Sequence, residues 1–407
     1  MKHAVVIIPT YNERESIVST IEGLLACTGG DPSWKCSLLV VDGNSPDGTA
    51  ETVRGVIRKH PDVYLLVEEK KEGIGAAYFK GFRHAVEKLG ADVLVEFDGD
   101  SQHPPEALPS MLRAIDGGAD LVLGSRRVPG GGYPEHWDPL RLFLSRAGGF
   151  LARLILFFPF RAFKAITDPT TGLKATRVQG PYQGLNFDSF RNRGFGYKVE
   201  MLFRLVELGA RVSEVPLKFR TRTSGESKMT QQTPVEILGT ALRLRLGEER
   251  TRRFIRFCVV GVSGFVVNAV LLELFVRAGF IGRLAGKFAF LSSHPVISIA
   301  SETAAWAAAF SVEGSIINNF LWNNFWTFHA RKASELLQTL KKFLAFNLLS
   351  VGGIIIQFCT VGLAARLLGN TAEVRQITLI LTIIFLVLPY NWLAYNKLVW
   401  RKRSRAT

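Results

Sequence analysis

The stretch VLVEFDGDSQHPPE, residues 93–106, contains the pattern that decides the fold of the first half of the chain. It begins as an apolar segment of strand character and then presents two carboxylates, Asp98 and Asp100, separated by one glycine. Two prolines, Pro104 and Pro105, end the extended segment. Because ligands bind at the carboxyl ends of strands in open α/β sheets, this pattern predicts a ligand-binding loop at a sheet edge.

Strands and helices are predicted in alternation on both sides of this stretch. Short apolar segments predict strands at residues 4–8, 37–41, 63–67, 93–97 and 120–123. Helical patterns predict helices at residues 15–25, 49–59, 74–88 and 106–117. The alternation is typical of an α/β fold with a doubly wound, mostly parallel sheet. One shared ligand site would then be formed by the polar loops at residues 9–13, 42–47 and 98–102.

The spacing of Asp98, Asp100 and Gln102 suits a metal site. Alternate residues of an extended segment point the same way, so these three side chains could meet on one hard cation and its phosphate ligands. An acidic turn is the other interpretation, since Asp and Gly are common in turns. We favour the cation because a carboxylate at the end of a buried strand is costly without a positive partner.

The composition indicates a lipid surface rather than nucleic acid as the partner. The chain of 407 residues is long enough for two or three domains, and its formal net charge is +15. No basic nucleic-acid-reading motif accompanies this charge, whereas residues 254–400 contain long apolar stretches, so anionic lipid headgroups fit better. The four cysteines form no CxxC pair, which argues against a zinc site and a disulfide framework.

Residues 139–166 mix aromatic and aliphatic side chains with basic ones. The segment is too charged to cross a bilayer and too apolar for an ordinary protein surface. This pattern is typical of amphipathic helices that lie in the lipid headgroup region. A pair of helices buried inside the first domain is the alternative interpretation.

Four membrane spans are predicted near residues 254–276, 304–326, 343–367 and 376–399. Basic residues gather before the first span, between the second and third, and after the fourth. The other two loops carry fewer of them. By the positive-inside rule, both termini and the first half of the chain would lie in the cytoplasm, on a multi-pass protein of the cell membrane.

Phosphate-bearing substrates are the chemistry that these features favour. A metal beside the carboxylates would neutralise a diphosphate leaving group as its bond to a sugar breaks. A phosphate acceptor is already largely anionic near neutral pH, so it needs positioning and charge compensation rather than a strong base. Arg126 follows a predicted strand, and Arg141 and Ser145 lie one helical turn apart, so the three could hold one phosphate together. Taken alone, Arg141 could equally be a surface arginine.

Seven motifs then point to a family. They are PTYNE (9–13), VDGNSPDGT (41–49), DGDSQHPPE (98–106), GSR (124–126), RLFLS (141–145), DPTTG (168–172) and EVPLKFRTRTSGESK (214–228). Together they make residues 1–235 resemble a family 2 glycosyltransferase of the dolichyl- or polyprenyl-phosphate mannose synthase type. The resemblance implies a cytosolic catalytic domain with the GT-A fold.

The resemblance also implies a role for each matched residue. The catalytic group would be Asp98, Asp100, Arg126, Arg141 and Ser145. Mg²⁺ or Mn²⁺ would be held by Asp100 and Gln102, and the lipid phosphate by Arg126, Arg141 and Ser145. The sugar nucleotide would contact Pro9, Tyr11, Glu13, Val41, Asp42, Asp98, Gly99, Asp100, Gln102, Lys198, Arg222 and Lys228.

One departure from the family pattern concerns the nucleotide. Such enzymes usually carry two consecutive aspartates where this chain has Asp42 and Gly43, and the second often contacts the nucleoside. Gly43 removes that carboxylate. Asp42 or Asp47 could compensate for it, so the base of the donor is open at this stage.

The second half of the chain resembles a GtrA-like membrane domain with four helices. The resemblance rests on FIRFCVVGVSGFVVN (254–268) and on the NNFLWNNFWTF segment that begins at residue 318. The expected organisation is a catalytic domain at 1–235, a basic linker at 236–253, the membrane domain at 254–400 and a basic cytoplasmic tail at 401–407. The membrane domain could serve as an anchor or help to move a lipid-linked sugar.

Together these features predict an inverting, metal-dependent transferase. It would move mannose from GDP-mannose to dolichyl or another polyprenyl phosphate at the cytoplasmic face of the lipid bilayer. Glucosyl transfer from UDP-glucose to the same lipid is the alternative within enzymes. A protein that translocates lipid-linked sugars is the alternative outside them, and the intact acidic cluster argues against it.

Overall fold

The structure of the chain is a computed structural model. It describes residues 1–28, 32–221, 232–277, 279–287, 303–329, 336–368, 377–378 and 381–400. The chain divides into two compact units, Met1–Leu246 and Gly247–Thr407. The expected tail at 401–407 lies outside the described residues.

The first unit is built on a seven-stranded sheet with the strand order β3-β2-β1-β4-β6-β5-β7. The strands are β1 (Lys2–Thr10), β2 (Trp34–Asp42), β3 (Val63–Val67), β4 (Val93–Glu96), β5 (Leu121–Ser125), β6 (Lys174–Arg177) and β7 (Val212–Pro216). Neighbours pair in parallel except around β6, which runs antiparallel to both β4 and β5. The predicted α/β fold with a mostly parallel sheet is therefore confirmed.

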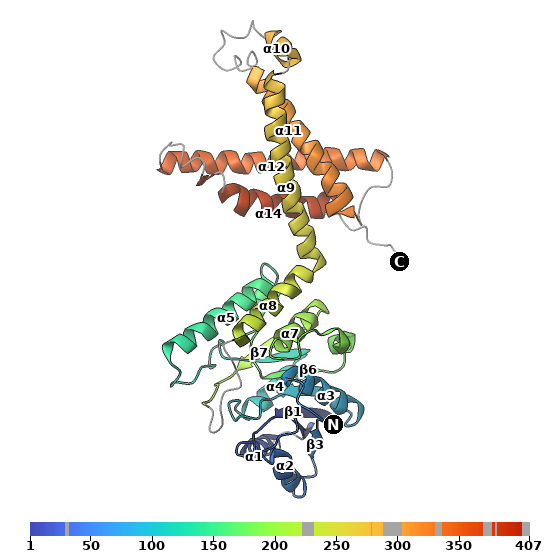
Figure 1. The fold of residues 1–407 in the computed structure, drawn as a ribbon, viewed down its shortest axis with the longest axis vertical. Coiled ribbons are helices and arrows are strands. Elements are labelled where there is room, and N and C mark those ends of the chain that lie inside the picture. The colour runs from blue at the N-terminus through green and yellow to red at the C-terminus, as the bar shows by residue number, and fades with distance from the viewer. Residues whose placement is uncertain are drawn as a thin grey trace. The chain divides into compact units, whose positions relative to one another are not determined.

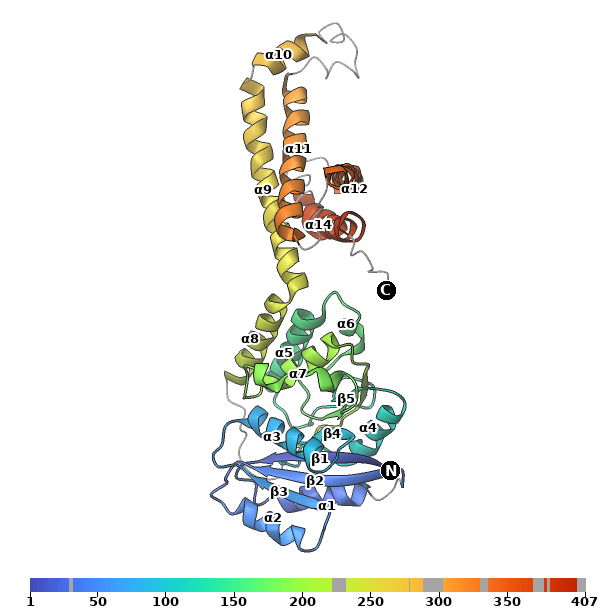
Figure 2. The same ribbon diagram turned by 90° about the vertical axis from the view of Figure 1, so that its right-hand side faces the viewer.

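Helices cover both faces of this sheet, which is why its strands read as continuous apolar runs. The helices are α1 (Ile17–Thr28), α2 (Thr49–Ile57), α3 (Ile74–Glu87), α4 (Ala107–Asp116) and α7 (Tyr197–Glu207). Val6 and Ile8 of β1 pack in one core with α1, α2 and α4, whereas Val5 and Ile7 pack in the other with α3 and α7. Figure 2 shows α1 and α2 on one side of the strands and α3 on the other.

The five predicted strands and four predicted helices of the first 125 residues are all present, with ends shifted by a few residues. The sequence analysis did not predict β6 and β7. The segment of β6 reads KATR and lacks the apolar pattern of a strand. It is nevertheless buried, because its Lys174 lies opposite Glu96 of β4 and forms an ion pair with it.

The segment 139–166 forms α5 (Pro139–Phe157) and the short α6 (Ala162–Ala165). Asp138 caps α5 by accepting a hydrogen bond from the backbone N–H of Arg141 at 3.0 Å. Ala152 and Leu156 are buried, whereas Leu140 and Phe143 are each 65% exposed. One side of α5 therefore packs on the first unit and another presents large apolar side chains, which the alternative of a fully buried helix pair does not allow.

Residues 232–247 form helix α8 (Gln232–Gly247), which belongs to the first unit. Its Ala241 is buried with α3 and α7, and Arg245 donates a hydrogen bond to the carbonyl oxygen of Phe158 at 3.2 Å. The segment 236–253, which was expected to be a basic linker, is therefore helical except at Glu248, and the division between the two compact units follows Leu246. Apolar residues among the arginines pack the helix against the first unit.

The second unit contains α9 (Glu249–Arg277), α10 (Gly279–Gly286), α11 (Thr303–Trp322), α12 (Leu336–Leu368) and α14 (Leu388–Ala394). Figure 1 shows α9 and α11 side by side. Ser315 donates to the carbonyl oxygen of Gly264 at 2.9 Å, and Asn318 donates to Ser263 at 3.0 Å. Small residues and side-chain hydrogen bonds of this kind join helices in apolar surroundings.

The helices α9, α11 and α12 overlap the first three predicted spans, and π-helical turns flank α14 in the fourth. Within the parts of the chain that the structure describes, no helix combines the length and the apolar character needed to cross a membrane. A ring cluster holds this unit together, with Phe328 stacked on Trp400 at 4.5 Å between ring centroids.

The glycines of α3 and α2 provide a test of the packing between helix and sheet. A Cβ at Gly81 of α3 would lie 2.6 Å from Cγ2 of Ile7, whereas a Cβ at Gly55 of α2 would meet no atom within 4 Å. We expect Gly81→Ala to lower the free energy of unfolding by about 1–3 kcal/mol through overpacking. The control Gly55→Ala should raise it by up to about 1 kcal/mol through helix propensity. Thermal unfolding of the full chain measures both, and equal shifts would contradict this packing.

Candidate functional site

A cavity of about 680 Å³ opens at the carboxyl ends of the central strands. The loops after β1, β2 and β4 form one part of its wall, and α5 forms another. Of the predicted site residues, those that line it are Pro9, Tyr11, Glu13, Asp98, Gly99, Asp100, Gln102, Arg126, Arg141, Ser145 and Lys198. The structure thus brings the predicted acidic group and the predicted phosphate-holding group into one space.

Backbone strain marks the same loops. Asn12, Asn44 and Ser101 have positive φ angles of 56°, 58° and 61°, a conformation that residues other than glycine rarely adopt. They lie in the loops after β1, β2 and β4, respectively. Among the described residues, no other non-glycine residue has a positive φ. Such conformations gather at functional sites because the surrounding structure must hold them in place.

Asp98 lies at the centre of the cavity wall and is held from two sides. Lys198 Nζ donates to both carboxylate oxygens at 3.2 Å, and the hydroxyl of Tyr78 donates to Oδ1 at 3.1 Å. Burial alone would raise the pKa of Asp98, but the charge and hydrogen bonds of Lys198 outweigh it and hold that pKa well below the usual range. Asp98 is therefore an anion that is already paired, which makes it a poor general base.

His103 supports Asp98 from behind. The backbone N–H of Asp98 donates to Nδ1 of His103 at 3.1 Å, so the ring proton is on Nε2, which lies 3.7 Å from Oδ2 of Asp98. Burial lowers the pKa of His103, which keeps the ring neutral near pH 7. Gly172 leaves the necessary room, because a Cβ there would lie 2.7 Å from both Asp98 Oδ2 and Lys198 Nζ.

Asp100 and Gln102 form one turn on the cavity wall. The backbone N–H of Gln102 donates to Oδ1 of Asp100 at 3.1 Å, and the side-chain amide of Gln102 donates to the carbonyl oxygen of Arg220 at 3.3 Å. The amide oxygen of Gln102 and the carboxylate of Asp100 are hard oxygen donors of the kind that Mg²⁺ and Mn²⁺ prefer.

No group of three or more His, Cys, Asp or Glu side chains suited to holding a metal ion occurs in the described ranges. The donor set is thus one carboxylate and one amide. This composition fits a cation that takes its remaining ligands from a diphosphate and water, as Mg²⁺ often does. The residues present therefore fit the predicted metal, and they do not form a closed protein cage.

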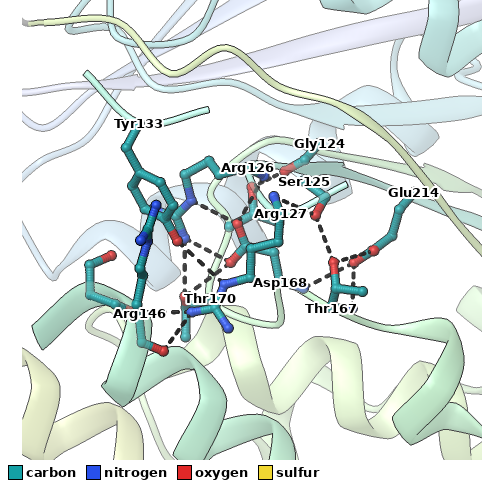
Figure 3. Close-up of polar contacts among 12 residues, drawn as sticks. Gly124, Ser125, Arg126, Arg127, Tyr133, Arg146, Thr167, Asp168, Thr170 and Glu214 are labelled. Carbon is teal, nitrogen blue, oxygen red and sulfur yellow. Dashed lines mark hydrogen bonds and ion pairs between the residues drawn. The ribbon is translucent and has the colours of Figure 1, made fainter. Parts of the chain in front are cut away.

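Arg126 is fixed in a bidentate ion pair with Asp168. Its Nε and Nη2 donate to the two carboxylate oxygens at 2.7 Å each, and Nη2 also donates to Thr170 at 3.2 Å. Burial opposes the charges, but the pair raises the pKa of Arg126 and lowers that of Asp168. Figure 3 shows Arg126 facing Asp168 and Thr170, with Tyr133 beside it. Among the described residues Nη1 makes no hydrogen bond, and Arg126 lines the cavity.

Arg141 and Ser145 line the cavity from α5, one helical turn apart. The guanidinium of Arg141 lies 4.2 Å from the centroid of the Trp137 ring, which holds it over an aromatic face. Arg127 anchors this part of α5, since its Nη2 donates to the carbonyl oxygens of Ser145 and Arg146 at 3.2 and 2.9 Å. The structure therefore ties α5 to the end of β5.

A second pair of buried charges lies beneath Asp98. Lys174 Nζ is 3.4 Å from Glu96 Oε2, and the hydroxyl of Tyr197 donates to the same oxygen at 2.6 Å. Burial lowers the pKa of Lys174 and raises that of Tyr197 well above its usual value. Each carboxylate at the end of β4 therefore forms an ion pair with a different lysine: Glu96 with Lys174, and Asp98 with Lys198.

Two of the predicted donor residues, Val41 and Asp42, are not among those that line the cavity, and two more cannot be placed in it. Val41 is fully buried in the core, and Asp42 is fully buried and accepts hydrogen bonds from Thr10 and Ser45. Neither residue is among those that line the cavity, and the hydrogen bonds of Asp42 hold the loop after β2. Arg222 and Lys228 lie outside the described residues.

The structure also places residues at the site that the sequence analysis did not assign. Tyr78 and His103 contact Asp98, Asp168 holds Arg126, and Glu68 lines the cavity. The DGDSQHPPE and DPTTG motifs contain His103 and Asp168, so their motif membership was a signal. Tyr78 and Glu68 lie in ordinary helix and strand-end positions, where no local pattern distinguishes them.

Comparison with known proteins agrees with this geometry. Residues 5–194 match the model of the family described as glycosyl transferase family 2. Residues 256–400 match the family described as the GtrA/DPMS transmembrane domain. The two matches correspond to the two compact units of the structure.

Similarity to known proteins extends over most of the chain. The chain is 33% identical to a dolichol-phosphate mannosyltransferase of Pyrococcus furiosus, over 87% of this chain and 88% of that protein. It is 42% identical to an undecaprenyl-phosphate mannosyltransferase of Micrococcus luteus, over 55% of this chain and 86% of that protein. A solved glucosyl-3-phosphoglycerate synthase of Mycobacterium tuberculosis, in complex with Mn²⁺ and UDP, matches with a TM-score of 0.45 and 20% identity, over 60% of this chain and 80% of that one. The chain belongs to glycosyl transferase family 2, as a glycosyltransferase that carries a GtrA/DPMS transmembrane domain behind its catalytic unit.

Proposed function

We propose that the protein transfers mannose from GDP-mannose to a polyprenyl phosphate such as dolichyl phosphate, with inversion at the sugar carbon. The supporting observation is that one cavity contains both Asp98–Asp100–Gln102 and the basic group of Arg126 and Arg141. A site with two phosphate-directed ends suits a sugar nucleotide facing a phosphate acceptor. The relatives named as dolichol- and undecaprenyl-phosphate mannosyltransferases support the same acceptor and sugar.

The acceptor phosphate would bind between Arg126 and α5. Asp168 and Thr170 fix the guanidinium of Arg126, whose Nη1 edge would face the acceptor, and Trp137 holds Arg141 of α5 at the same cavity. Two arginines offset the charge of the phosphate and orient one oxygen toward the sugar. Because a phosphate monoester is already anionic near neutral pH, no side chain has to remove a proton.

The donor would lie with its diphosphate beside Asp100 and Gln102. These two residues would hold Mg²⁺ or Mn²⁺, which would supply Lewis-acid stabilisation to the departing diphosphate. Asp98 and Lys198 orient the donor as a fixed dipole whose carboxylate stays ionised.

The same unit would meet the membrane through α5. Leu140, Phe143 and Leu144 are 56–65% exposed on the helix that carries Arg141 and Ser145. A helix with such a surface binds at the headgroup level of a bilayer, which is where a lipid phosphate lies. We propose four spans in the second unit and a cytoplasmic catalytic unit, as the basic flanks predict. The exposed apolar side of α5 supports contact between the first unit and a membrane.

A donor comparison tests the proposed function. Full-length protein is incubated with polyprenyl phosphate, Mg²⁺ and either GDP-mannose or UDP-glucose, and the lipid-linked product is measured. We expect product from GDP-mannose and at most a trace from UDP-glucose. A preference for UDP-glucose would replace the proposal with the glucosyl alternative.

Removal of the Asp100 carboxylate tests the metal site. We expect Asp100→Ala to lower turnover by about 100-fold or more, since a Lewis acid contributes several kcal/mol to transition-state stabilisation. Membrane association, measured by flotation with liposomes, should stay unchanged. The control Asp188→Ala removes an exposed carboxylate that lies outside the cavity and should keep full turnover. Near-full activity of chelator-treated wild type would contradict the metal role.

The role of Arg141 in acceptor binding can be separated from general attraction to lipid. We expect Arg141→Ala to raise the KM for polyprenyl phosphate by about 10- to 100-fold, the effect of a charged hydrogen bond, with little change in GDP binding. Lys164→Ala removes the same charge from the exposed surface of α6, away from the cavity, and serves as the matched control. An equal rise in KM for both variants would show that only surface charge matters.

A further inference from the structure

Gly43 lines the cavity, and the fold does not require a glycine at this position. Its φ lies outside the left-handed region, so the backbone there would accept any residue. A Cβ at this position would lie 3.4 Å from Cδ2 of Tyr11 and 3.6 Å from Oε2 of Glu68, which is ordinary contact. The glycine therefore opens a gap that is bordered by an aromatic ring and a carboxylate.

The carboxylate beside this gap is firmly placed. Glu68 follows β3 directly, and its backbone N–H donates to the carbonyl oxygen of Asp42 at 2.8 Å. Its Oε1 accepts a hydrogen bond from Lys80 Nζ at 2.8 Å, which leaves Oε2 on the side of Gly43. Glu68 is 5% exposed, and it lines the cavity together with Tyr11 and Gly43.

The position of Glu68 in the sheet indicates which part of the donor it meets. This step rests on the proposed function, in which the diphosphate lies at the end of β4 and the acceptor at β5 and α5. The remaining side of the cavity is formed by the ends of β1, β2 and β3. β3 is three strands away from β4, or about 14 Å at the usual strand spacing. The ribose is attached to the diphosphate and the base lies beyond it, so the outermost group on this side meets the base.

We propose that Glu68 recognises the base of the donor and selects guanine. A carboxylate accepts hydrogen bonds only, and guanine offers two adjacent donors on one edge, its N1–H and its 2-amino group. The corresponding edge of uracil carries a single N–H between two carbonyl oxygens. These two oxygens would be repelled by a carboxylate. Glu68 at the end of β3 thus supplies the hydrogen-bond-accepting carboxylate that is missing at position 43, at the end of β2.

Inosine nucleotides test this contact because they keep N1–H and lack only the 2-amino group. GDP and IDP binding to the full-length protein is measured by calorimetry in Mg²⁺. We expect wild type to prefer GDP by about 10- to 100-fold, the effect of a hydrogen bond to a charged group. Glu68→Ala should weaken GDP binding and reduce this preference to about threefold or less.

Two further variants separate recognition from folding. Lys80→Met breaks the same ion pair but keeps the carboxylate, and Lys80 does not line the cavity, so this variant should retain the preference for GDP. Glu68→Ala combined with Gly43→Asp returns a carboxylate to the same space, and we expect it to restore at least part of the preference. Thermal unfolding of each variant confirms that it is folded.

The outcomes are distinct. An undiminished preference for GDP in Glu68→Ala, or its equal loss in Lys80→Met, would overturn the role of Glu68 while GDP-mannose remained the donor. If wild type instead uses UDP-glucose in the donor comparison, the proposed function itself fails before any variant is compared.

Discussion

The site depends on how the fold stabilises two carboxylates at the end of β4. Glu96 is buried in the sheet and Asp98 stands at its edge, and each would be unstable as an anion without a cation beside it. Lys174 on β6 pairs with Glu96, and Lys198 on α7 pairs with Asp98. Both lysines come from a part of the chain 78–100 residues later. The proposed donor end of the cavity therefore depends on β6 and α7, which come much later in the chain than β4.

At the proposed acceptor end of the cavity, too, a buried charge has an opposite charge beside it, but the signs are reversed. There the cation, Arg126, faces the cavity, and Asp168 behind it supplies the opposite charge. Breaking a buried pair by removing one partner costs about 3–5 kcal/mol, so Asp168 keeps the guanidinium in one orientation even when no phosphate is bound. In the proposed function, an arginine that is already ordered loses little conformational freedom when the lipid phosphate binds. Arg127 extends this order to α5 through the carbonyl oxygens of Ser145 and Arg146.

The parts of the molecule that the sequence could predict are those fixed by local pattern. Alternating apolar segments and polar strand ends predicted the sheet, and the apolar strand that ends in Asp98, Asp100 and Gln102 predicted a loop at the sheet edge, where these residues line the cavity. The antiparallel strand β6 escaped prediction because Lys174 makes it polar, although pairing with Glu96 buries it. Val41 and Asp42 were assigned to the donor by motif alone, and the structure shows that strand alternation directs them into the core and the loop.

Glu68 shows why a sequence motif cannot predict a contact between two loops. The family pattern places a carboxylate at position 43, and by that pattern alone this chain lacks it. In the fold, the ends of β2 and β3 are adjacent, so a side chain that is 25 residues later in sequence reaches within contact distance of the same point. In the proposed recognition of the base, Gly43 leaves Oε2 of Glu68 without a second carboxylate beside it, and an aspartate at position 43 would bring two anions together. The two positions therefore depend on each other, although each alone looks like an ordinary substitution.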